Sequence, residues 1–173
     1  MRWPFVIILS GPPAVGKNTV ARRVCEAFPL RIAAIDLDHV KRFIPHAPST
    51  DFFLDLSSDL AQSMLPIYLK AGISVVVHKP FCRFDYVRPF IDICRECSAD
   101  YRYFKLTAPL EDLLKRNPDR PIPSPEADLR RIFDSHNTYA HPEGVTIDTR
   151  QHGIEGTVRR ILECVQETCD DVA

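Results

Sequence analysis

One short stretch near the start of the chain has the residue types and spacing that bind phosphate: Gly11-Pro12-Pro13-Ala14-Val15-Gly16-Lys17-Asn18-Thr19. Glycines let the backbone turn so that successive N–H groups point at one anion, and the lysine adds a positive charge for the terminal phosphates. An apolar run over residues 5–9 precedes the stretch, and apolar residues at helical spacing follow it. This order of strand, loop and helix predicts nucleoside triphosphate binding. The predicted contacts are Gly11, Pro12, Ala14, Val15, Gly16, Lys17, Asn18 and Thr19.

The residue after the lysine departs from the usual phosphate loop. That position normally carries Ser or Thr, whose hydroxyl binds Mg²⁺. Here it is Asn18, and the hydroxyl comes one residue later, at Thr19. We predict that Thr19 contributes to a Mg²⁺ site, and the sequence leaves open whether Asn18 weakens that site.

Two carboxylates, Asp36 and Asp38, follow the next strand-like run, residues 31–35. Phosphoryl transfer needs Mg²⁺, positive charge on the migrating group and a carboxylate that takes the acceptor's proton. We predict that Asp38 is this base, because a carboxylate just past a strand end can reach a hydroxyl lying against the γ-phosphate. We predict that Asp36 holds Mg²⁺, through water. The alternative is that these acids cap the following helix, a role that suits Asp.

Arginine and lysine residues that could bind phosphate or the acceptor come after the later predicted strands. Arg116 and Arg120 lie at a proline-rich segment in which the prolines oppose regular structure. We predict that residues 116–125 form a short lid and that both arginines contact the nucleotide, with Arg120 stabilising charge during transfer. The alternative is that these arginines are solvated surface side chains. The candidate acceptor contacts are Asp38, Arg42, Lys79 and Arg83.

Strand-like and helix-like segments alternate along the chain. Strands are expected at residues 5–9, 31–35, 73–77, 101–106 and 145–147, and helices after the phosphate loop and at 51–70, 85–97, 126–137 and about 154–165. A shorter helix should begin under a Thr107 cap and end at Arg116, and Pro45 and Pro48 predict a loop. The alternation predicts the α/β class, a three-layer α/β/α domain with a five-stranded parallel sheet. Right-handed crossovers would gather the predicted site residues at one edge of that sheet.

The motifs together resemble those of small P-loop kinases. The loop spacing is similar to the G-x-P-x-x-G-K-G-T loop of adenylate kinases and other nucleoside monophosphate kinases. The D-x-D at Asp36 and Asp38 resembles that of shikimate kinase, gluconate kinase and chloramphenicol phosphotransferase, and the lid-like segment and closing strand fall in the same order. The resemblance implies the fold of P-loop containing nucleoside triphosphate hydrolases, with ATP and Mg²⁺ as cofactors. It also implies that residues 149–151 line the adenine, which brings Arg150 to the nucleotide.

Length and composition set bounds on the partners. The chain has 173 residues, 45% of them hydrophobic, which favours a single domain over residues 1–173. Lys and Arg total 22 against 23 Asp and Glu, a net charge of -1, so we expect neither nucleic acid nor a membrane surface as partner. No apolar stretch approaches a membrane span, and we expect a cytoplasmic protein, monomer or homodimer. Cys94 and Cys97 form a C-x-x-C without a second pair, which favours buried thiols over zinc or disulfides.

These features favour an ATP-dependent kinase that phosphorylates a hydroxyl of a small metabolite or antibiotic-like molecule. One alternative is a nucleoside monophosphate kinase, on the loop spacing. An alternative of another class is a nucleotide-binding switch without turnover, because fold does not fix function. A GTPase is disfavoured because the chain has no N-K-x-D motif.

Overall fold

The computed structural model describes residues 3–28, 30–44 and 51–170. Its centre is a sheet of five parallel strands in the order β2-β3-β1-β4-β5, which confirms the predicted sheet. The strands are β1 (Phe5–Ser10), β2 (Ile32–Asp36), β3 (Ser74–His78), β4 (Asp100–Thr107) and β5 (Val145–Asp148). Every residue of β1 and β3 is buried. Parallel strands covered on both faces are rich in Val and Ile for this reason.

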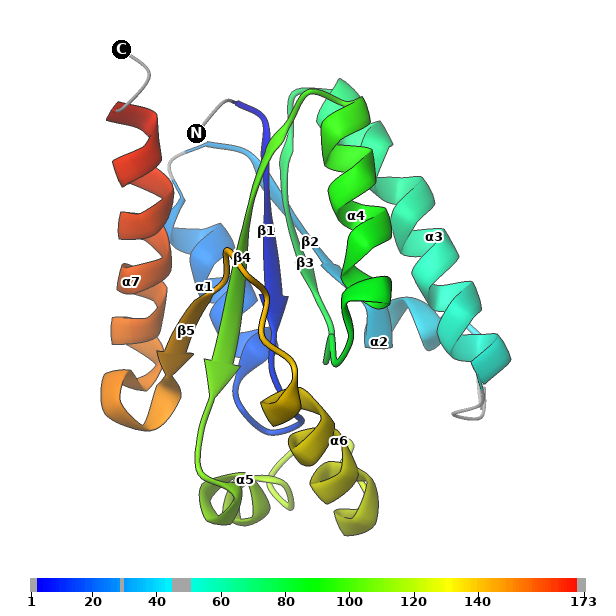
Figure 1. The fold of residues 1–173 in the computed structure, drawn as a ribbon, viewed down its shortest axis with the longest axis vertical. Coiled ribbons are helices and arrows are strands. Elements are labelled where there is room, and N and C mark those ends of the chain that lie inside the picture. The colour runs from blue at the N-terminus through cyan, green and yellow to red at the C-terminus, as the bar shows by residue number, and fades with distance from the viewer. Residues whose placement is uncertain (1–2, 29, 45–50, 171–173) are drawn as a thin grey trace.

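Helices cover both faces of the sheet (Figure 1). On one side lie α1 (Lys17–Ala27) and α7 (Thr149–Asp170), and on the other α3 (Asp51–Lys70) and α4 (Phe84–Glu96). Alternate residues of β1 divide between two apolar clusters: Phe5, Ile7 and Leu9 join one, and Val6 and Ile8 join the other. This is the period-2 pattern of a strand whose two faces are both buried. The three-layer α/β/α architecture is therefore as predicted.

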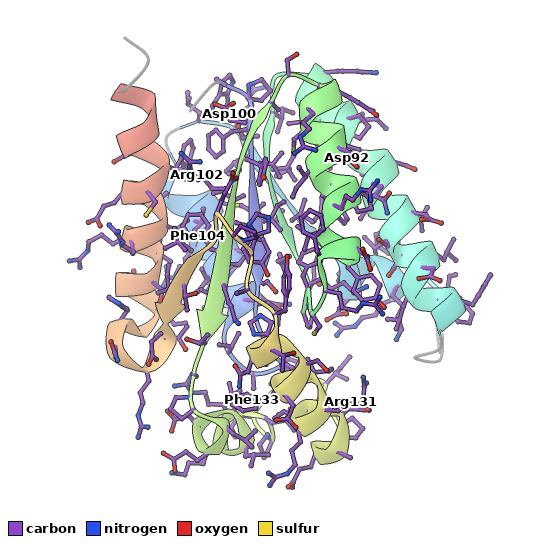
Figure 2. The ribbon with its side chains drawn as sticks, in the orientation of Figure 1. Asp92, Asp100, Arg102, Phe104, Arg131 and Phe133 are labelled. Carbon is purple, nitrogen blue, oxygen red and sulfur yellow. The ribbon has the colours of Figure 1, made fainter. Side chains whose placement is uncertain are left out.

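Three further helices lie toward the carboxyl ends of the strands: α2 (Leu37–Lys41), α5 (Leu110–Arg116) and α6 (Glu126–Thr138). Of these, α5 and α6 lie at the bottom of Figure 1. The last two are attached to the main core. Leu113 of α5 and Leu129 of α6 are buried in the same cluster as Phe104 of β4, and Phe133 packs against that cluster (Figure 2). The predicted lid is the segment that joins α5 to α6.

Two details of the helices differ from the prediction. Thr107 does not cap α5: it is the last residue of β4, and its hydroxyl donates to the carbonyl oxygen of Ile147 in β5 at 3.4 Å. Pro109 takes the cap position without a side-chain hydrogen bond. In addition, α7 starts earlier than expected, at Thr149, and is interrupted at Gly153, whose φ of 62° lies in the left-handed region. The loop predicted at Pro45 and Pro48 lies outside the described residues.

Two further predictions concern thiols and membranes. Cys25, Cys82, Cys94, Cys97 and Cys164 are all free, as expected for buried or partly buried thiols. Burial raises the pKa of Cys94 to about 12, with Cys97 adding to the effect, so this thiol is unreactive. Across residues 3–28, 30–44 and 51–170, none of the helices has the length and apolar character that crossing a bilayer would require.

Candidate active site

The phosphate loop is a tight turn between β1 and α1. Its two glycines are required for different structural reasons, one for space and one for its backbone conformation. A Cβ atom on Gly11 would lie 2.7 Å from a side-chain carbon of Val15 and 2.9 Å from the carbonyl oxygen of Leu106. Gly16 has a φ of 102°, which L side chains rarely adopt, and caps the start of α1. The turn therefore brings backbone N–H groups and a helix start to one point, as the sequence predicted for an anion site.

Lys17 is folded back onto this turn. Its Nζ donates hydrogen bonds to the carbonyl oxygens of Gly11 (2.8 Å) and Pro12 (2.9 Å), and the residue is only 7% exposed. Burial lowers the pKa of Lys17 to about 8; Arg120 lowers it further, while Asp38 and Asp36 oppose the shift. A bound phosphate would stabilise the protonated amine, which burial disfavours.

A cavity of about 240 Å³ opens beside the loop. It lies between the phosphate loop, α5 and the first turns of α7, where the sequence predicted the nucleotide base. Gly153 contributes through the break in α7, and a Cβ atom there would meet nothing within 4 Å. The cavity is lined by Ala14, Val15, Gly16, Arg116, Thr149, Gly153 and Ile154.

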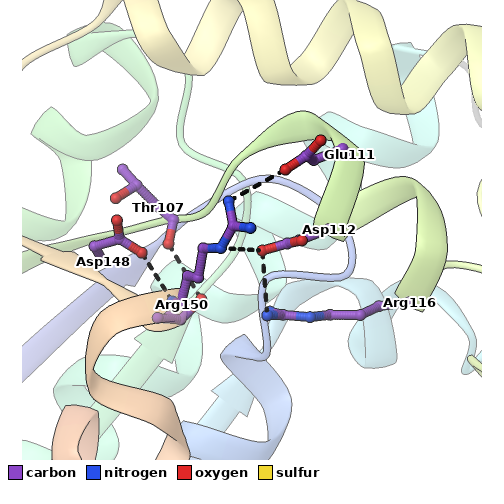
Figure 3. A network of polar contacts seen from close by, with 7 residues as sticks. Thr107, Glu111, Asp112, Arg116, Asp148 and Arg150 are labelled. Atoms are coloured by element: carbon purple, nitrogen blue, oxygen red, sulfur yellow. Dashed lines mark hydrogen bonds and ion pairs between the residues drawn. The ribbon is translucent and has the colours of Figure 1, made fainter.

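Arg116 and Arg150 are joined by acidic residues of α5 (Figure 3). Arg150 pairs with Glu111 at 3.2 Å and with Asp112 at 3.4 Å, and Arg116 lies 3.9 Å from the same oxygen of Asp112. Arg116 also lines the cavity, and its contact with a nucleotide stays a prediction. The guanidinium of Arg150 faces the acids of α5, and its role toward the nucleotide stays a prediction.

Asp36 is the centre of a second set of polar contacts. It caps α2, accepting a hydrogen bond from the backbone N–H of Asp38 at 3.0 Å, so the capping alternative is correct for this residue. Its other oxygen accepts from Nδ2 of Asn18 at 2.8 Å, whereas Nδ1 of His78 lies 3.9 Å from the oxygen that caps α2. Asn18, which replaces the usual hydroxyl residue, is therefore directed at the predicted metal ligand.

Asp36 and Thr19 remain the predicted ligands of a Mg²⁺ ion held jointly with a nucleotide. Within the described ranges, no group of three or more His, Cys, Asp and Glu side chains could enclose a metal. Mg²⁺ in nucleotide sites is commonly bound by one or two protein oxygens together with phosphates and waters. Asp36 and the exposed Thr19, in the first turn of α1, can supply such oxygens.

Asp38 lies among cations that come from distant parts of the chain. Its carboxylate favours the charged forms of Lys17, Lys79 and Arg120, raising their pKa values against the burial that lowers each of them. The structure thus brings the predicted base together with the predicted phosphate, acceptor and lid residues. Arg42 also contributes, since its charge lowers the pKa of Arg120.

Arg83 is placed differently. Its guanidinium pairs with Asp85 at 3.1 Å, lies 5.7 Å from the centre of the Tyr86 ring, and is 66% exposed. Nζ of Lys79 lies over the same ring, also at 5.7 Å. Arg83 is therefore turned toward its own helix start, and its role as an acceptor contact remains a prediction.

Residues 6–142 match the profile of a protein family described as an AAA domain. The chain belongs to this family. It is 27% identical over 160 residues to the L-seryl-tRNA(Sec) kinase of Methanococcus maripaludis, a match that covers 85% of this chain. The chain spans about 60% of the length of that relative.

The fold of this AAA domain protein is shared by solved kinase structures. A gluconokinase from Sinorhizobium meliloti superposes with a TM-score of 0.72 at 17% identity, covering 99% of this chain and 97% of that one. The APS kinase of Mycobacterium tuberculosis, in complex with AMPPNP and APS, gives 0.72 at 12% identity, covering 96% and 99%. The resemblance to small P-loop kinases is therefore confirmed at the level of the fold.

The segment predicted to form a lid contains a residue that the sequence did not single out. Nδ2 of Asn117 donates to the carbonyl oxygen of Ser124 at 2.8 Å, and its oxygen accepts from the N–H of Ser124 at 3.0 Å. The same oxygen, at 3.3 Å, and the hydroxyl of Ser124, at 2.8 Å, both accept from Arg120. Asn117 therefore closes the lid loop and holds Arg120 within it. A buried amide is recognisable only once its surroundings are known, so the sequence offered no signal.

Proposed function

We propose that the protein is an ATP-dependent kinase that transfers the γ-phosphate of ATP to a hydroxyl group of a small molecule. The observation that carries this proposal is the position of Asp38, beside the phosphate loop and among Lys17, Lys79 and Arg120. A carboxylate surrounded by cations at a triphosphate site suits proton removal from an acceptor while charge builds on the migrating group. The kinase names of the similar proteins agree with this proposal.

In the proposed reaction the acceptor oxygen forms a bond to the γ-phosphorus while the bond between that phosphorus and the β,γ-bridging oxygen breaks, releasing ADP. Asp38 takes the proton of the acceptor hydroxyl. Lys17 and Arg120 stabilise the charge on the transferring phosphoryl group and on ADP. Asp36 and Thr19 would hold Mg²⁺, which neutralises charge on the β- and γ-phosphates when bound.

The proposed acceptor is a small molecule that carries a negative charge where it meets Lys79 and Arg42. Lys79 is partly buried beside Asp38 and is also influenced by Asp55, and Arg42 lies close enough to act on Arg120. With a net charge of -1 the protein has no general attraction for nucleic acid. We propose a cytoplasmic enzyme, monomer or homodimer, that uses Mg²⁺ and needs no nucleic-acid partner.

The proposal is tested by measuring ADP release with a panel of acceptors: nucleoside monophosphates, sugar acids, shikimate-like acids and hydroxylated antibiotics. We expect ADP to form steadily only when an acceptor carrying a hydroxyl is added. Turnover confined to nucleoside monophosphates would favour the nucleotide kinase instead. Nucleotide binding without ADP formation from any acceptor would favour the switch.

A pair of arginine variants then locates the acceptor. Arg42→Ala should weaken the binding of an anionic acceptor by about 1.5 to 3 kcal/mol, the usual worth of a hydrogen bond to a charged group. Arg83→Ala is the matched control, because Arg83 already pairs with Asp85. Equal losses in both variants would show that Arg83 reorients and contacts the acceptor, as the sequence predicted.

A further inference from the structure

The strand that leads into the phosphate loop is hydrogen bonded to the far end of α6. Oγ of Ser10, the last residue of β1, lies 3.1 Å from Nε2 of His136, in the last turns of α6. Both residues are completely buried, at 0% exposure. Since Ser10 directly precedes Gly11, this contact connects the helix that follows the lid to the base of the phosphate loop.

The Ser10 hydroxyl is shared between Phe81 and His136. It lies 3.1 Å from the carbonyl oxygen of Phe81, to which it can donate, and accepts from the N–H of Phe81 at 3.0 Å. When its one proton is directed at Phe81, Nε2 of His136 is the donor in the contact with Ser10. Burial, with Lys105 and Lys17 adding to it, lowers the pKa of His136 to about 3, so the ring stays neutral near pH 7.

The junction around this contact is polar. In the described part of the chain, four buried side-chain atoms lack a hydrogen-bond partner: Tyr103 Oη, His136 Nδ1, Tyr139 Oη and His141 Nε2. The ring of Tyr103 stacks on His141 at 4.7 Å and meets the edge of Tyr139 at 6.3 Å. Two directed contacts hold this end of α6: the contact between Ser10 and His136, and the hydrogen bond that Nζ of Lys105 donates to the carbonyl oxygen of Tyr139 at 2.6 Å.

Apolar and polar contacts together define the direction of α6. Leu129, in the first turn of the helix, is fully buried in the apolar core, and Phe133 packs against the same core one turn further on. His136 lies about two helical turns beyond Leu129, on the same face. Its bond to Ser10 adds a directed contact at the end of α6 that is farther from the lid.

The other end of α6 continues directly into the lid. The helix begins at Glu126, and Ser124, two residues earlier, accepts the hydrogen bond of Arg120 at 2.8 Å. Glu126 lies three residues from Leu129 and His136 seven residues from it, about 5 Å and 10 Å along the axis, so a shift at His136 moves the lid end by about half as much. We propose that His136 is a positioning residue: its hydrogen bond to Ser10 sets the direction of α6 and thereby holds Arg120 over Lys17 and Asp38. The catalytic consequence rests on the proposed kinase function.

Three substitutions separate this role from general packing. Gln can place an amide N–H where Nε2 of histidine lies, whereas the shorter Asn cannot, and Leu fills the space without any donor. We expect His136→Gln to keep kcat within about threefold of wild type. His136→Asn and His136→Leu should lower kcat by about tenfold or more, since small misplacements of catalytic groups are costly. Their Kd for ATP should change less than about threefold, because the phosphate loop itself is intact.

Amide hydrogen exchange gives a readout that does not depend on catalysis. Residues 126–138 should exchange faster in the Asn and Leu variants than in wild type or His136→Gln. Tyr139→Phe, which removes an unpaired hydroxyl from the same junction, is the matched control and should change neither kcat nor exchange. Ser10→Ala tests the contact from its other partner if His136→Leu does not fold, and it should also accelerate this exchange.

Equal kcat and equal exchange in the Gln, Asn and Leu variants would overturn the proposal, as would parallel losses of kcat and ATP affinity in the Asn variant. A failure of the kinase function is distinguishable from both. In that case wild type would bind ATP and transfer no phosphate, while the exchange rates of residues 126–138 would still confirm or contradict the anchoring role of His136.

Discussion

The amine of Lys17 is buried, and burial disfavours its protonated form. Its pKa of about 8 lies below the ordinary 10.5. Between these values the unfolded chain binds more protons than the folded one, so the contribution of Lys17 to stability rises with pH across that window. A bound triphosphate acts in the opposite direction, because it favours the protonated amine. The same residue thus makes nucleotide binding depend on pH.

We expect the affinity for ATP to fall as the pH is raised from about 7 to 9.5, because Lys17 loses its proton near pH 8. Lys17→Arg, which remains protonated throughout, should bind ATP more weakly than wild type but without this pH dependence. Calorimetric titrations with ATP at several pH values measure both. A Lys17→Arg variant that follows the wild-type pH profile would show that another group is responsible.

Lys17→Met should stay folded and lose activity by about 10² to 10³.

Asp36 and Asp38 are two residues apart but have different surroundings, and their variants should differ accordingly. Asp38→Asn should lower kcat by about 10² or more with little change in ATP affinity, because it removes the base and no nucleotide contact. Asp36→Asn should mainly raise the Mg²⁺ concentration needed for activity. Rates measured across a Mg²⁺ titration compare the two variants. Identical responses would mean that the two roles are wrongly assigned.

In the loop between α5 and α6, the side-chain amide of Asn117 accepts a hydrogen bond from Arg120. Arg120→Ala should lower kcat more than it weakens ADP binding, since charge stabilisation matters most during transfer. Asn117→Ala should have the same effect to a smaller degree, because Arg120 loses one acceptor and the loop loses its closure to Ser124. Asp119→Ala, an exposed change in the same loop, is the control. Equal losses of kcat and ADP affinity in Arg120→Ala would make this residue a ground-state contact.

The first turns of α5 and α7 are linked by the acids shown in Figure 3, next to the cavity that Arg116 lines. Asp112 contacts both Arg116 and Arg150, whereas Glu111 contacts Arg150 alone. We expect Asp112→Asn to raise the KM for ATP by about 3- to 10-fold, because Arg116 loses its partner at the cavity. Glu111→Gln, farther from the cavity residue, should change KM less than twofold. Steady-state kinetics on both variants measure this, and equal effects would assign the link to Arg150 rather than Arg116.

For the molecule as a whole, periodicity and motif spacing were enough to predict the five-strand parallel sheet and its covering helices. Residues 74–78 form a continuous buried strand, and the phosphate loop sits between β1 and α1, because both features are local in sequence. The edge position of Lys17, Asp38 and Arg120 followed from the handedness of the crossovers. These three residues are brought together in the structure.

Contacts between distant segments could not be predicted from the sequence. Ser10 and His136 are far apart in the chain and belong to no motif, so their hydrogen bond depends on how α6 packs on the sheet. Asn18 appeared only as a departure from the usual loop, and its bond to Asp36 required β2 to be placed. Thr107 was assigned to a cap because local spacing allowed it, while strand pairing with β5 used its hydroxyl instead.

Tracing the γ-phosphate of ATP shows directly whether the protein transfers it to an acceptor. Wild-type protein is incubated with γ-labelled ATP, Mg²⁺ and the acceptor that releases most ADP, and the label is traced to acceptor, water or enzyme. We predict that the label appears on an acceptor hydroxyl, in step with ADP, and that Asp38→Asn lowers this transfer by about 10² or more while binding ATP normally. Label that goes only to water, or transfer that Asp38→Asn leaves unchanged, would contradict the account.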